Sequence, residues 1–257
     1  MSDPAIADLM VCALADCLTS DEVCTNGAAS FLPVAAIGLA RRTGAPALTH
    51  IGGAVGVDPR WQELSGSTVG PAYWEGAAAL LNHPHEFWPF VGAGRITTIF
   101  HRAAQIDARG NLNNSEIHGE RPVRLPGGAA MGDTAALIPR VLIWSTTHDR
   151  RTFVDRVDYR TCPGYLDRPG QREALGMPGG PDRVVTDLAT MDFTPEGRMR
   201  LRSLHPGVDL ATVEERTGFE LAMPPGEVPT TREPTPAESD LIAALDPAGY
   251  RFGEFRA

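Results

Sequence analysis

Lysine is absent from this chain of 257 residues, and all 23 basic residues are arginine. The absence excludes a lysine Schiff base and the lysine of a phosphate-binding P-loop. The sequence also lacks the GxGxxG pattern of dinucleotide-binding folds. The segment LSGST at 64–68 does not match the GxSxG turn that presents a nucleophilic serine. Dinucleotide binding and serine-hydrolase chemistry are therefore not expected.

Positive charge and long hydrophobic runs are scarce as well. The formal net charge is −9, and nucleic-acid binding needs a basic surface. Gly, Pro and charged residues interrupt the apolar runs, so no segment is long enough to cross a bilayer. The start, MSDPAIADLM, lacks the basic region of a secretory signal. We therefore expect a cytoplasmic protein that binds neither nucleic acid nor membranes.

Cysteine is sparse and forms no CxxC pair. The pattern favours buried reduced thiols over a zinc site or a cysteine nucleophile. A metal site is also conceivable in HPHE at 83–86, through His83, His85 and Glu86, but Pro84 favours a solvated turn. We therefore predict no metal ion. The four cysteines are Cys12, Cys17, Cys24 and Cys162.

Segments with helical and strand-like patterns alternate along the chain. Strands joined by helices favour parallel pairs with right-handed crossovers. The predicted fold is therefore α/β, with an open, mostly parallel sheet flanked by helices. Residues 1–222 are expected to form this α/β domain, and 223–257 a Pro-rich extension with a short helix. Helices are expected at 3–18, 30–44, 74–83, 131–140, 209–218 and 236–249, and strands within 21–30, 46–51, 95–100, 141–146, 183–194 and 198–207.

Glycine loops are the most informative local feature. Ligands of open α/β sheets bind at the carboxyl ends of strands, and three loops qualify: Asn26-Gly27, Gly52-Gly53 and Gly127-Gly128. The loop LPGGAAMGD at 125–133 offers backbone N–H groups that could hold an anionic oxygen, although a plain turn explains it equally well. By contrast, the alternating charges of THDRRTFVDRVDYR at 147–160 predict a solvent-facing loop. The tryptophans are expected in the core or at an interface.

Three longer motifs carry a family resemblance. AAQIDARGNLNNS (103–115), LPGGAAMGDTAAL (125–137) and VVTDLATMDFTPEGRMRLRSLHPGVDLATVEERTGFEL (184–221) resemble the beta subunit of class I coenzyme A transferases. The resemblance implies the CoA-transferase α/β fold and an alpha subunit of similar fold, in a heterodimer or heterotetramer. It also implies an acyl-CoA thioester bound where the subunits meet, so CoA enters as part of the substrate and no separate cofactor is expected.

One position departs from this family. Its transferases carry a glutamate nucleophile in a Glu-Ser-Gly or Glu-Asn-Gly motif after the strand equivalent to 46–51. This chain has LTHIGGAVGVDP at 48–59, and Ile51 stands in the place of the glutamate, at the shoulder of a glycine loop. Isoleucine cannot form an acyl anhydride or a thioester. Residues 44–57 contain no Asp or Glu, and Asp58 and Glu63 lie too far along the chain.

A scaffold without the nucleophile resembles an actinobacterial branch of the family, the cholesterol ring-cleaving hydrolases. The resemblance implies hydrolytic C–C cleavage of a cyclohexenone carboxyl-CoA in steroid degradation, with the acid/base residue on the alpha subunit and no catalytic side chain on this chain. A true CoA transferase and a non-catalytic scaffold subunit remain alternatives. The predicted substrate-binding residues are Asn26, Gly27, Ile51, Gly52, Gly53, Gly127, Gly128 and Met131.

Overall fold

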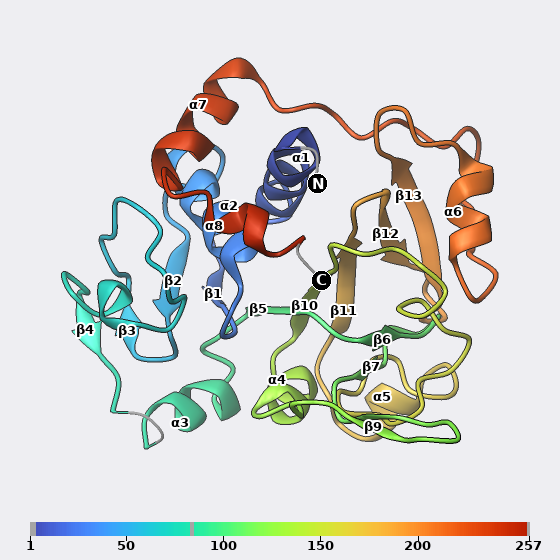
Figure 1. Cartoon of the computed structure of the whole chain (residues 1–257). Helices are drawn as coiled ribbons and strands as arrows, with labels where there is room; N and C mark the ends of the chain where they lie inside the picture. Colours follow the sequence, from blue (N-terminus) through green and yellow to red (C-terminus); the bar gives the residue numbers. More distant parts are fainter. Residues whose placement is uncertain (1–3, 83–84, 256–257) are drawn as a thin grey trace. The chain divides into compact units, whose positions relative to one another are not determined.

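The computed structural model describes residues 4–82 and 85–255. The chain divides into two compact units, whose elements Figure 1 labels. Unit 1 combines Met1–Phe100 with Arg232–Ala257, and unit 2 is the continuous segment His101–Thr231. The chain therefore leaves unit 1 once and returns to it for its last segment.

The strands of unit 1 are parallel on one side and antiparallel on the other. β1 (Val23–Thr25) runs parallel to both of its neighbours, β2 (Thr49–Gly52) and β5 (Thr98–His101). β3 (Gly56–Val57) and β4 (Ala79–Leu80) continue beyond β2 as antiparallel partners. Parallel neighbours require a crossover connection, and a helix supplies it between β1 and β2.

The helices of unit 1 are apolar over much of their length. Every residue of α2 from Leu32 to Ala40 is buried, and a helix without a polar face must be covered on several sides. The blue α1 and the red C-terminal helices lie around α2 in Figure 1 and contact it. The helices are α1 (Pro4–Ala15), α2 (Phe31–Arg42), the 3-10 turn η1 (Pro71–Tyr73), α3 (Phe87–Gly92), α7 (Pro236–Leu245) and α8 (Tyr250–Gly253).

Ion pairs fasten the C-terminal segment to α1. Arg251 is buried and contacts Asp8 at 2.7 Å and Asp246 at 3.0 Å. Arg232 contacts Asp16 at 2.6 Å, near the end of α1. The buried charges around Arg251 are costly to separate, because each partner would remain desolvated, whereas the Arg232–Asp16 pair is exposed and contributes less. The last segment is thus a structural part of unit 1.

The same segment also caps α2. The N-cap residue Ser30 makes no side-chain cap bond. Instead, the backbone N–H of Phe31 donates to the Glu254 carboxylate at 2.8 Å, and the Phe31 ring stacks on Tyr250 with centroids 5.3 Å apart. A carboxylate at a helix start satisfies a free N–H and is favoured by the helix dipole. Residues near the C-terminus therefore fix the place where α2 begins.

Unit 2 has a four-stranded arrangement and two small hairpins. β10 and β11 are parallel, whereas β12 and β13 follow as antiparallel partners. The apolar run of β10 is buried from Val141 to Trp144, as expected for a strand covered on both faces. The strands are β6 (Gln105–Ile106), β7 (Leu112–Asn113), β8 (Glu116–Ile117), β9 (Val123–Arg124), β10 (Arg140–Trp144), β11 (Gly180–Val185), β12 (Ala189–Phe193) and β13 (Met199–Leu204). The helices are α4 (Met131–Leu137), α5 (Gln171–Ala174) and α6 (Leu210–Arg216).

Arg172 on α5 is buried and bonds to no carboxylate among the described residues. Its side chain is 1% exposed, and its guanidinium donates to five backbone carbonyls. A guanidinium carries five N–H donors in a fixed plane, so one side chain ties the loop after Cys162, the end of α4 and the approach to β11 together. The acceptors are the carbonyl oxygens of Pro163, Gly164, Ala135, Pro178 and Gly179, at 2.6 to 3.1 Å.

The predicted α/β class, with helices flanking an open sheet, is confirmed. The helices expected at 3–18, 30–44, 209–218 and 236–249 are present, although shorter at their ends. The prediction of a helix at 74–83 was wrong for the residues that the structure describes. Gly76 there has φ +66°, and the alanine-rich stretch pairs with β3 as strand β4.

The segment 147–160 also differs from its prediction. It is a loop, but His148, Phe153 and Val157 are buried. The Phe153 carbonyl accepts from the N–H of Gly218 at 2.7 Å, and the His148 and Phe153 rings stack with centroids 4.0 Å apart. The alternating charges of the segment did not reveal that several of its side chains face the interior of unit 2.

Two other expectations concern the chain as a whole. None of the helices within the described ranges is long and apolar enough to span a membrane. The predicted boundary at residue 222 separates a family-like region from an extension, and it stays a prediction. The two contact-defined units are a separate property of the fold.

Candidate functional site

Two of the three predicted loops lie in unit 1. Asn26 and Gly27 follow β1, and Gly53 follows β2. These strands are adjacent and parallel, with Thr25 paired to Ile51, and the Thr25 hydroxyl donates to the Ile51 carbonyl at 2.9 Å. The structure therefore brings both loops together at the carboxyl edge of unit 1, where open α/β sheets bind ligands.

Ile51 lies inside a strand and not at the shoulder of a loop. β2 continues through Gly52, and Ile51 pairs with Val57 of β3. Its side chain is 1% exposed in this chain. The pattern Ile-Gly-Gly suggested an earlier strand end, but the β2–β3 hairpin carries the pairing further. Its predicted role as an apolar wall for the substrate stays a prediction.

Close packing within the chain explains why positions 52 and 53 are glycine. A methyl group on Gly52 would stand 2.8 Å from the Cβ of Tyr73. Gly53 has φ +57°, and a methyl group there would stand 3.0 Å from the Cα of Val69. The indole nitrogen of Trp74 lies beside Gly53, buried and without a hydrogen-bond partner in the part of the chain that the structure describes. The segment 69–74 thus passes over the hairpin so closely that only glycine fits.

Gly27 differs from these two glycines. The nearest atoms to a methyl group there would be the Ser30 hydroxyl at 3.4 Å and the Phe100 carbonyl oxygen at 4.0 Å. These are ordinary van der Waals distances, and the backbone of Gly27 is not left-handed. The packing of unit 1 therefore does not demand glycine at this position.

The third predicted loop lies in unit 2, before α4. Gly127 has φ +92°, and none of the described atoms lies within 4 Å of the place its Cβ would take. Its N–H donates to the Asn114 carbonyl at 2.7 Å. A methyl group on Gly128, in contrast, would overlap the Cγ2 of Thr161. Met131 begins α4, and its sulfur accepts from the Asn114 amide at 3.3 Å.

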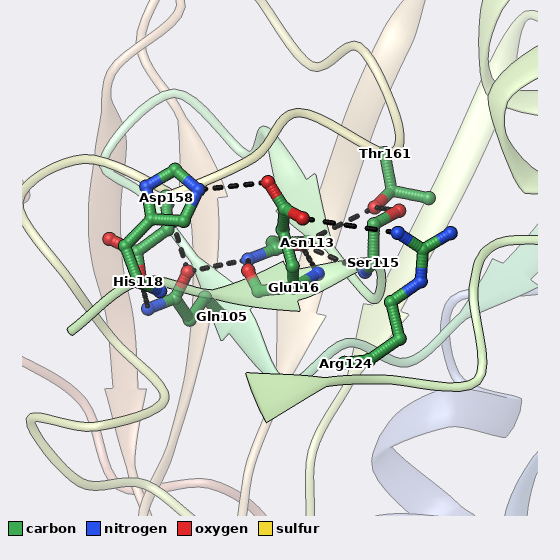
Figure 2. A network of polar contacts seen from close by, with 8 residues as sticks. All are labelled: Gln105, Asn113, Ser115, Glu116, His118, Arg124, Asp158 and Thr161. Carbon is green, nitrogen blue, oxygen red and sulfur yellow. Dashed lines mark hydrogen bonds and ion pairs between the residues drawn. The ribbon is translucent and has the colours of Figure 1, made fainter. Parts of the chain in front are cut away.

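A polar network adjoins this loop, and Figure 2 shows its members. The Thr161 hydroxyl pairs with that of Ser115 at 2.7 Å. The buried amide of Asn113 donates to Gln105 at 2.8 Å, and Gln105 donates to Asp158 at 2.9 Å. The segment NLNNS, part of the family resemblance, therefore uses its side chains to hold β6, β7 and the loop at 158–161 together.

The exposed end of the network consists of surface ion pairs. His118 lies 2.9 Å from the Glu116 carboxylate, and Arg124 lies 3.9 Å from it. All three side chains are at least one-third exposed. Pairs of this kind contribute about 1 kcal/mol or less. These residues form a solvated surface and do not have the buried geometry of an acid–base site.

Asp58, the acid nearest to Ile51 along the chain, is already paired with an arginine. Asp58 lies 2.6 Å from the Arg41 guanidinium, and its N–H donates to the His50 carbonyl at 2.7 Å. This ion pair directs the Asp58 carboxylate toward Arg41 of α2. Asp58 therefore does not offer a free carboxylate in place of the missing glutamate.

The cysteines are free, and Cys12, Cys24 and Cys162 are buried. Burial raises the pKa of Cys12 and of Cys162 to about 12, so both stay thiols at neutral pH. A cysteine nucleophile needs the opposite shift. No group of three or more potential metal ligands occurs in the described ranges. His83 and Pro84 of the HPHE segment lie outside them.

Asp187, after β11, was missed by the sequence reasoning. One of its carboxylate oxygens is buried without a hydrogen-bond partner in the described chain. Burial raises the pKa of this group to about 6, although the backbone N–H groups of Asp187 and His148 oppose the shift. His148 is buried between the hydroxyls of Thr186 and Thr217, each 3.0 Å away. The TD pair in VVTDLATMDF is the only trace of this turn in the sequence.

Asp187→Asn is expected to stabilise the protein above pH 6. The folded pKa exceeds the ordinary 3.8, so the folded state binds more protons between these values and stability falls as pH rises through them. At pH 8 the asparagine, which keeps an acceptor oxygen, is expected to raise the free energy of unfolding by about 1 to 2 kcal/mol. Urea unfolding at pH 4 and pH 8 measures this. An equal effect of the substitution at both pH values would contradict it.

The chain belongs to the coenzyme A transferase family, because residues 6–216 match the family's sequence pattern. The beta subunit of the 3-oxoadipate CoA-transferase of Pseudomonas knackmussii is 33% identical over 96% of this chain and 95% of that protein. The cholesterol ring-cleaving hydrolase IpdB subunit of Rhodococcus jostii is 34% identical over 65% of this chain and 69% of that protein. The resemblance to class I beta subunits is thereby confirmed.

Solved structures agree with the family assignment. The decarboxylase AibA/AibB has a chain that matches with a TM-score of 0.84 and 27% identity, covering 99% of this chain and 100% of that one. The IpdAB structure from Rhodococcus jostii RHA1 matches with a TM-score of 0.80 and 26% identity over the full length of both chains. One fold thus serves proteins named for different reactions, and the reaction must be argued from the site.

Proposed function

We propose that this chain is the beta subunit of a heteromeric enzyme that opens a ring in an acyl-CoA by hydrolytic C–C cleavage, the last steroid ring of a cyclohexenone carboxyl-CoA. In this proposal the partner is an alpha subunit of similar fold, which supplies the acid–base residue. Two relatives support a C–C bond reaction by their names, the ring-cleaving hydrolase and the decarboxylase.

The missing nucleophile is the observation that carries the proposal. A CoA transferase of this family needs a carboxylate that attacks the thioester. Ile51 occupies that place, residues 44–57 hold no acid, and Asp58 is paired with Arg41. Ring hydrolysis needs no covalent enzyme intermediate, because water provides the attacking oxygen. A hydrocarbon at this position is compatible with hydrolysis and incompatible with CoA transfer.

The reaction balances without any group beyond water. The partner's base takes a proton from water, and the hydroxide adds to the ring ketone to give an alkoxide. The alkoxide collapses to a carboxylic acid as the adjacent C–C bond breaks, and the electron pair of that bond passes to the carbon activated by the thioester. The proton on the base then neutralises this carbon. The product is the ring-opened acyl-CoA with one new carboxyl group.

This chain would contribute binding and backbone dipoles to that sequence. Gly127 leaves open space where a substrate oxygen could approach backbone N–H groups, and Gly27 has only ordinary van der Waals neighbours, whereas Gly52, Gly53 and Gly128 set the shape of the loops by close packing. Preorganised N–H groups stabilise negative charge as it develops on an oxygen. Met131 and Ile51 complete the predicted contacts, whereas the Asn26 side chain bonds to the Gly27 and Thr68 carbonyls within the β1 loop.

The distinction between hydrolysis and CoA transfer can be tested by trapping. We expect no covalent CoA adduct when the assembled alpha–beta enzyme is incubated with the cyclohexenone acyl-CoA and treated with borohydride. The intact beta chain, weighed by mass spectrometry, keeps its mass, while the acyl-CoA gains the mass of one water. Borohydride reduces a glutamyl-CoA thioester to an alcohol and releases CoA, so a glutamate of this chain converted to the alcohol would establish the alternative, a true CoA transferase, which the 33% identity to a transferase subunit favours. Loss of carbon dioxide from the substrate would point to decarboxylation.

Gly27→Ala tests whether this chain contacts substrate or only completes the partner's site. Because a methyl group fits there, we expect unchanged stability and assembly. If a substrate oxygen approaches this loop, the methyl group is expected to lower kcat/KM about tenfold, which equals 1.4 kcal/mol. Gly44→Ala is the control, since none of the described atoms lies within 4 Å of the place its methyl group would take. Equal activity of both variants would favour a scaffold role for the loop.

A further inference from the structure

His50 is a buried histidine next to the candidate site that no feature of the sequence marked. It precedes Ile51 on β2, and its side chain is fully buried. Its Nε2 lies 2.8 Å from the Asn26 carbonyl oxygen Oδ1. Its Nδ1 lies 3.4 Å from the indole nitrogen of Trp61. The ring thus connects the β1 loop with an aromatic residue behind β2.

The hydrogen bonds at the two ring nitrogens of His50 determine which nitrogen carries the proton. The indole of Trp61 can only donate, so the Nδ1 of His50 must be a bare acceptor. At the other end, the Asn26 amide nitrogen donates to the carbonyls of Gly27 at 2.9 Å and Thr68 at 3.0 Å. Turning that amide over would place its oxygen against two carbonyl oxygens. Asn26 Oδ1 therefore faces His50, and Nε2 must carry the hydrogen.

A charged His50 is excluded by the same contacts. A proton on Nδ1 would point at the N–H of Trp61, and the ring has no carboxylate partner in the described chain. Burial lowers the pKa of His50 to about 3, and the charge on Arg41 acts in the same direction. The ring is therefore neutral and in one tautomer across the whole physiological range.

The hydrogen bonds lead from His50 through the Asn26 side chain to the Gly27 carbonyl. It accepts from the Asn26 amide and, at 3.1 Å, from the Thr68 hydroxyl. Because a trans peptide places its C=O and N–H on opposite sides, holding this carbonyl inward turns the N–H of Ala28 outward. Ala28 is exposed, and its N–H has no partner within the described ranges. Ala29 follows with φ +48°, and consecutive free N–H groups in such turns attract anionic oxygens.

We propose that His50 is a positioning residue for the reaction: through Asn26 it holds the Gly27–Ala28 peptide with its N–H directed toward the oxygen of the bound acyl group. This rests on the proposed function only in placing the Asn26–Gly27 loop against the substrate. Asn26 is buried, and both of its amide hydrogens and one lone pair of its Oδ1 are used within the chain. Asn26 therefore acts through its neighbours and not by direct contact with the substrate.

The tautomer of His50 can be measured without any substrate. Nitrogen-15 NMR of the full chain, labelled at histidine and assigned to His50 by the signals that a His50→Gln variant lacks, is expected to show this ring with Nε2 protonated and Nδ1 bare, unchanged between about pH 5 and 8. A His50 ring that titrates in this range, or that is protonated at Nδ1, overturns the proposal. This readout does not depend on which acyl-CoA the enzyme uses.

Turnover by the assembled alpha–beta enzyme supplies the second readout. His50→Leu replaces the ring by an apolar side chain of similar size and so removes the hydrogen-bond donor to Asn26. We expect kcat to fall at least about tenfold, with KM little changed. His50→Gln keeps an N–H donor and is expected to recover most of the loss. A purely structural role predicts lower stability in both variants but equal kcat for the assembled enzyme, and that result overturns the proposal.

Thr68→Val provides an independent arm in case His50→Leu fails to assemble. It deletes the other side-chain bond to the Gly27 carbonyl and leaves His50 in place, so kcat is expected to fall to a similar extent. Unchanged kcat in this variant contradicts the proposal. The unaltered enzyme, tested on the cyclohexenone acyl-CoA, decides the proposed function separately, because the NMR result is independent of that assay.

Discussion

Arg172→Ala is expected to lower the free energy of unfolding by about 4 kcal/mol or more. The substitution leaves five backbone carbonyls without their donor in the interior of unit 2. Each unsatisfied buried acceptor costs about 1 to 3 kcal/mol unless water reaches it. No bonded carboxylate is left behind, because the partners of the guanidinium in the described part of the chain are backbone carbonyls. The expected loss therefore comes from hydrogen bonding and not from a broken ion pair.

Arg172→Lys separates charge from donor geometry. An ammonium group has three donors on a flexible stem, against five in the rigid plane of arginine, so lysine is expected to recover part of the loss. Arg168→Ala, at an exposed neighbouring position, is the control and is expected to stay within about 0.5 kcal/mol. Denaturant midpoints and slopes of the three variants measure the effect. If Arg172→Ala unfolds at the same midpoint as Arg168→Ala, the carbonyl cluster does not stabilise unit 2.

Gly128→Ala is expected to be the most damaging change in the three predicted loops. Its methyl group would overlap the Cγ2 of Thr161, whose hydroxyl is bonded to the Asn114 N–H and to Ser115. Either the loop or Thr161 must move, and overpacking of this kind costs about 1 to 3 kcal/mol. Because the displaced loop leads into α4 and Met131, activity is expected to fall along with stability.

Thr161→Ser offers a matched suppressor for this clash. It removes Cγ2 and keeps the hydroxyl, after which the nearest side-chain atom to the new methyl group is the Cβ of Met131 at 3.6 Å. The double variant is therefore expected to be more stable than Gly128→Ala alone. A double-mutant cycle should give a coupling of about 1 to 2 kcal/mol. Additive effects of the two substitutions would show that the overlap is not the cause.

The sequence predicted the regular parts of the fold because their patterns are long. The apolar stretches at 3–18 and 30–44 and the buried run at 141–146 each carry a clear period or composition. The segment at 74–83 has the alanines of a helix, but its partner is strand β3, which no local pattern reveals. The segment NLNNS, which contains β7 and precedes β8, bonds through its Asn111 and Ser115 side chains to Leu166 and Thr161, some fifty residues away.

The site was predictable only in part, for a similar reason. Glycine loops after β1 and β2 follow from the α/β pattern, and the structure places them at one edge of unit 1. Whether a glycine serves a ligand or the chain's own packing depends on atoms distant in sequence, such as Tyr73 above Gly52. His50, Asp187 and Arg172 look like ordinary surface residues in their local sequences. Burial alone distinguishes them.

The discontinuity of unit 1 has a consequence for biosynthesis. During translation α1 and α2 emerge from the ribosome first. The residues of the C-terminal segment that bind them emerge only after the whole of unit 2. These are Arg232, which binds Asp16, Arg251, which binds Asp8, and Glu254, which binds the start of α2. Unit 2 is contiguous and can fold as it emerges, since domains fold as units during translation. The part of α2 that α7 and α8 contact therefore stays uncovered while roughly 190 further residues are made. We expect this interval to leave apolar surface of the nascent N-terminal segment open to aggregation.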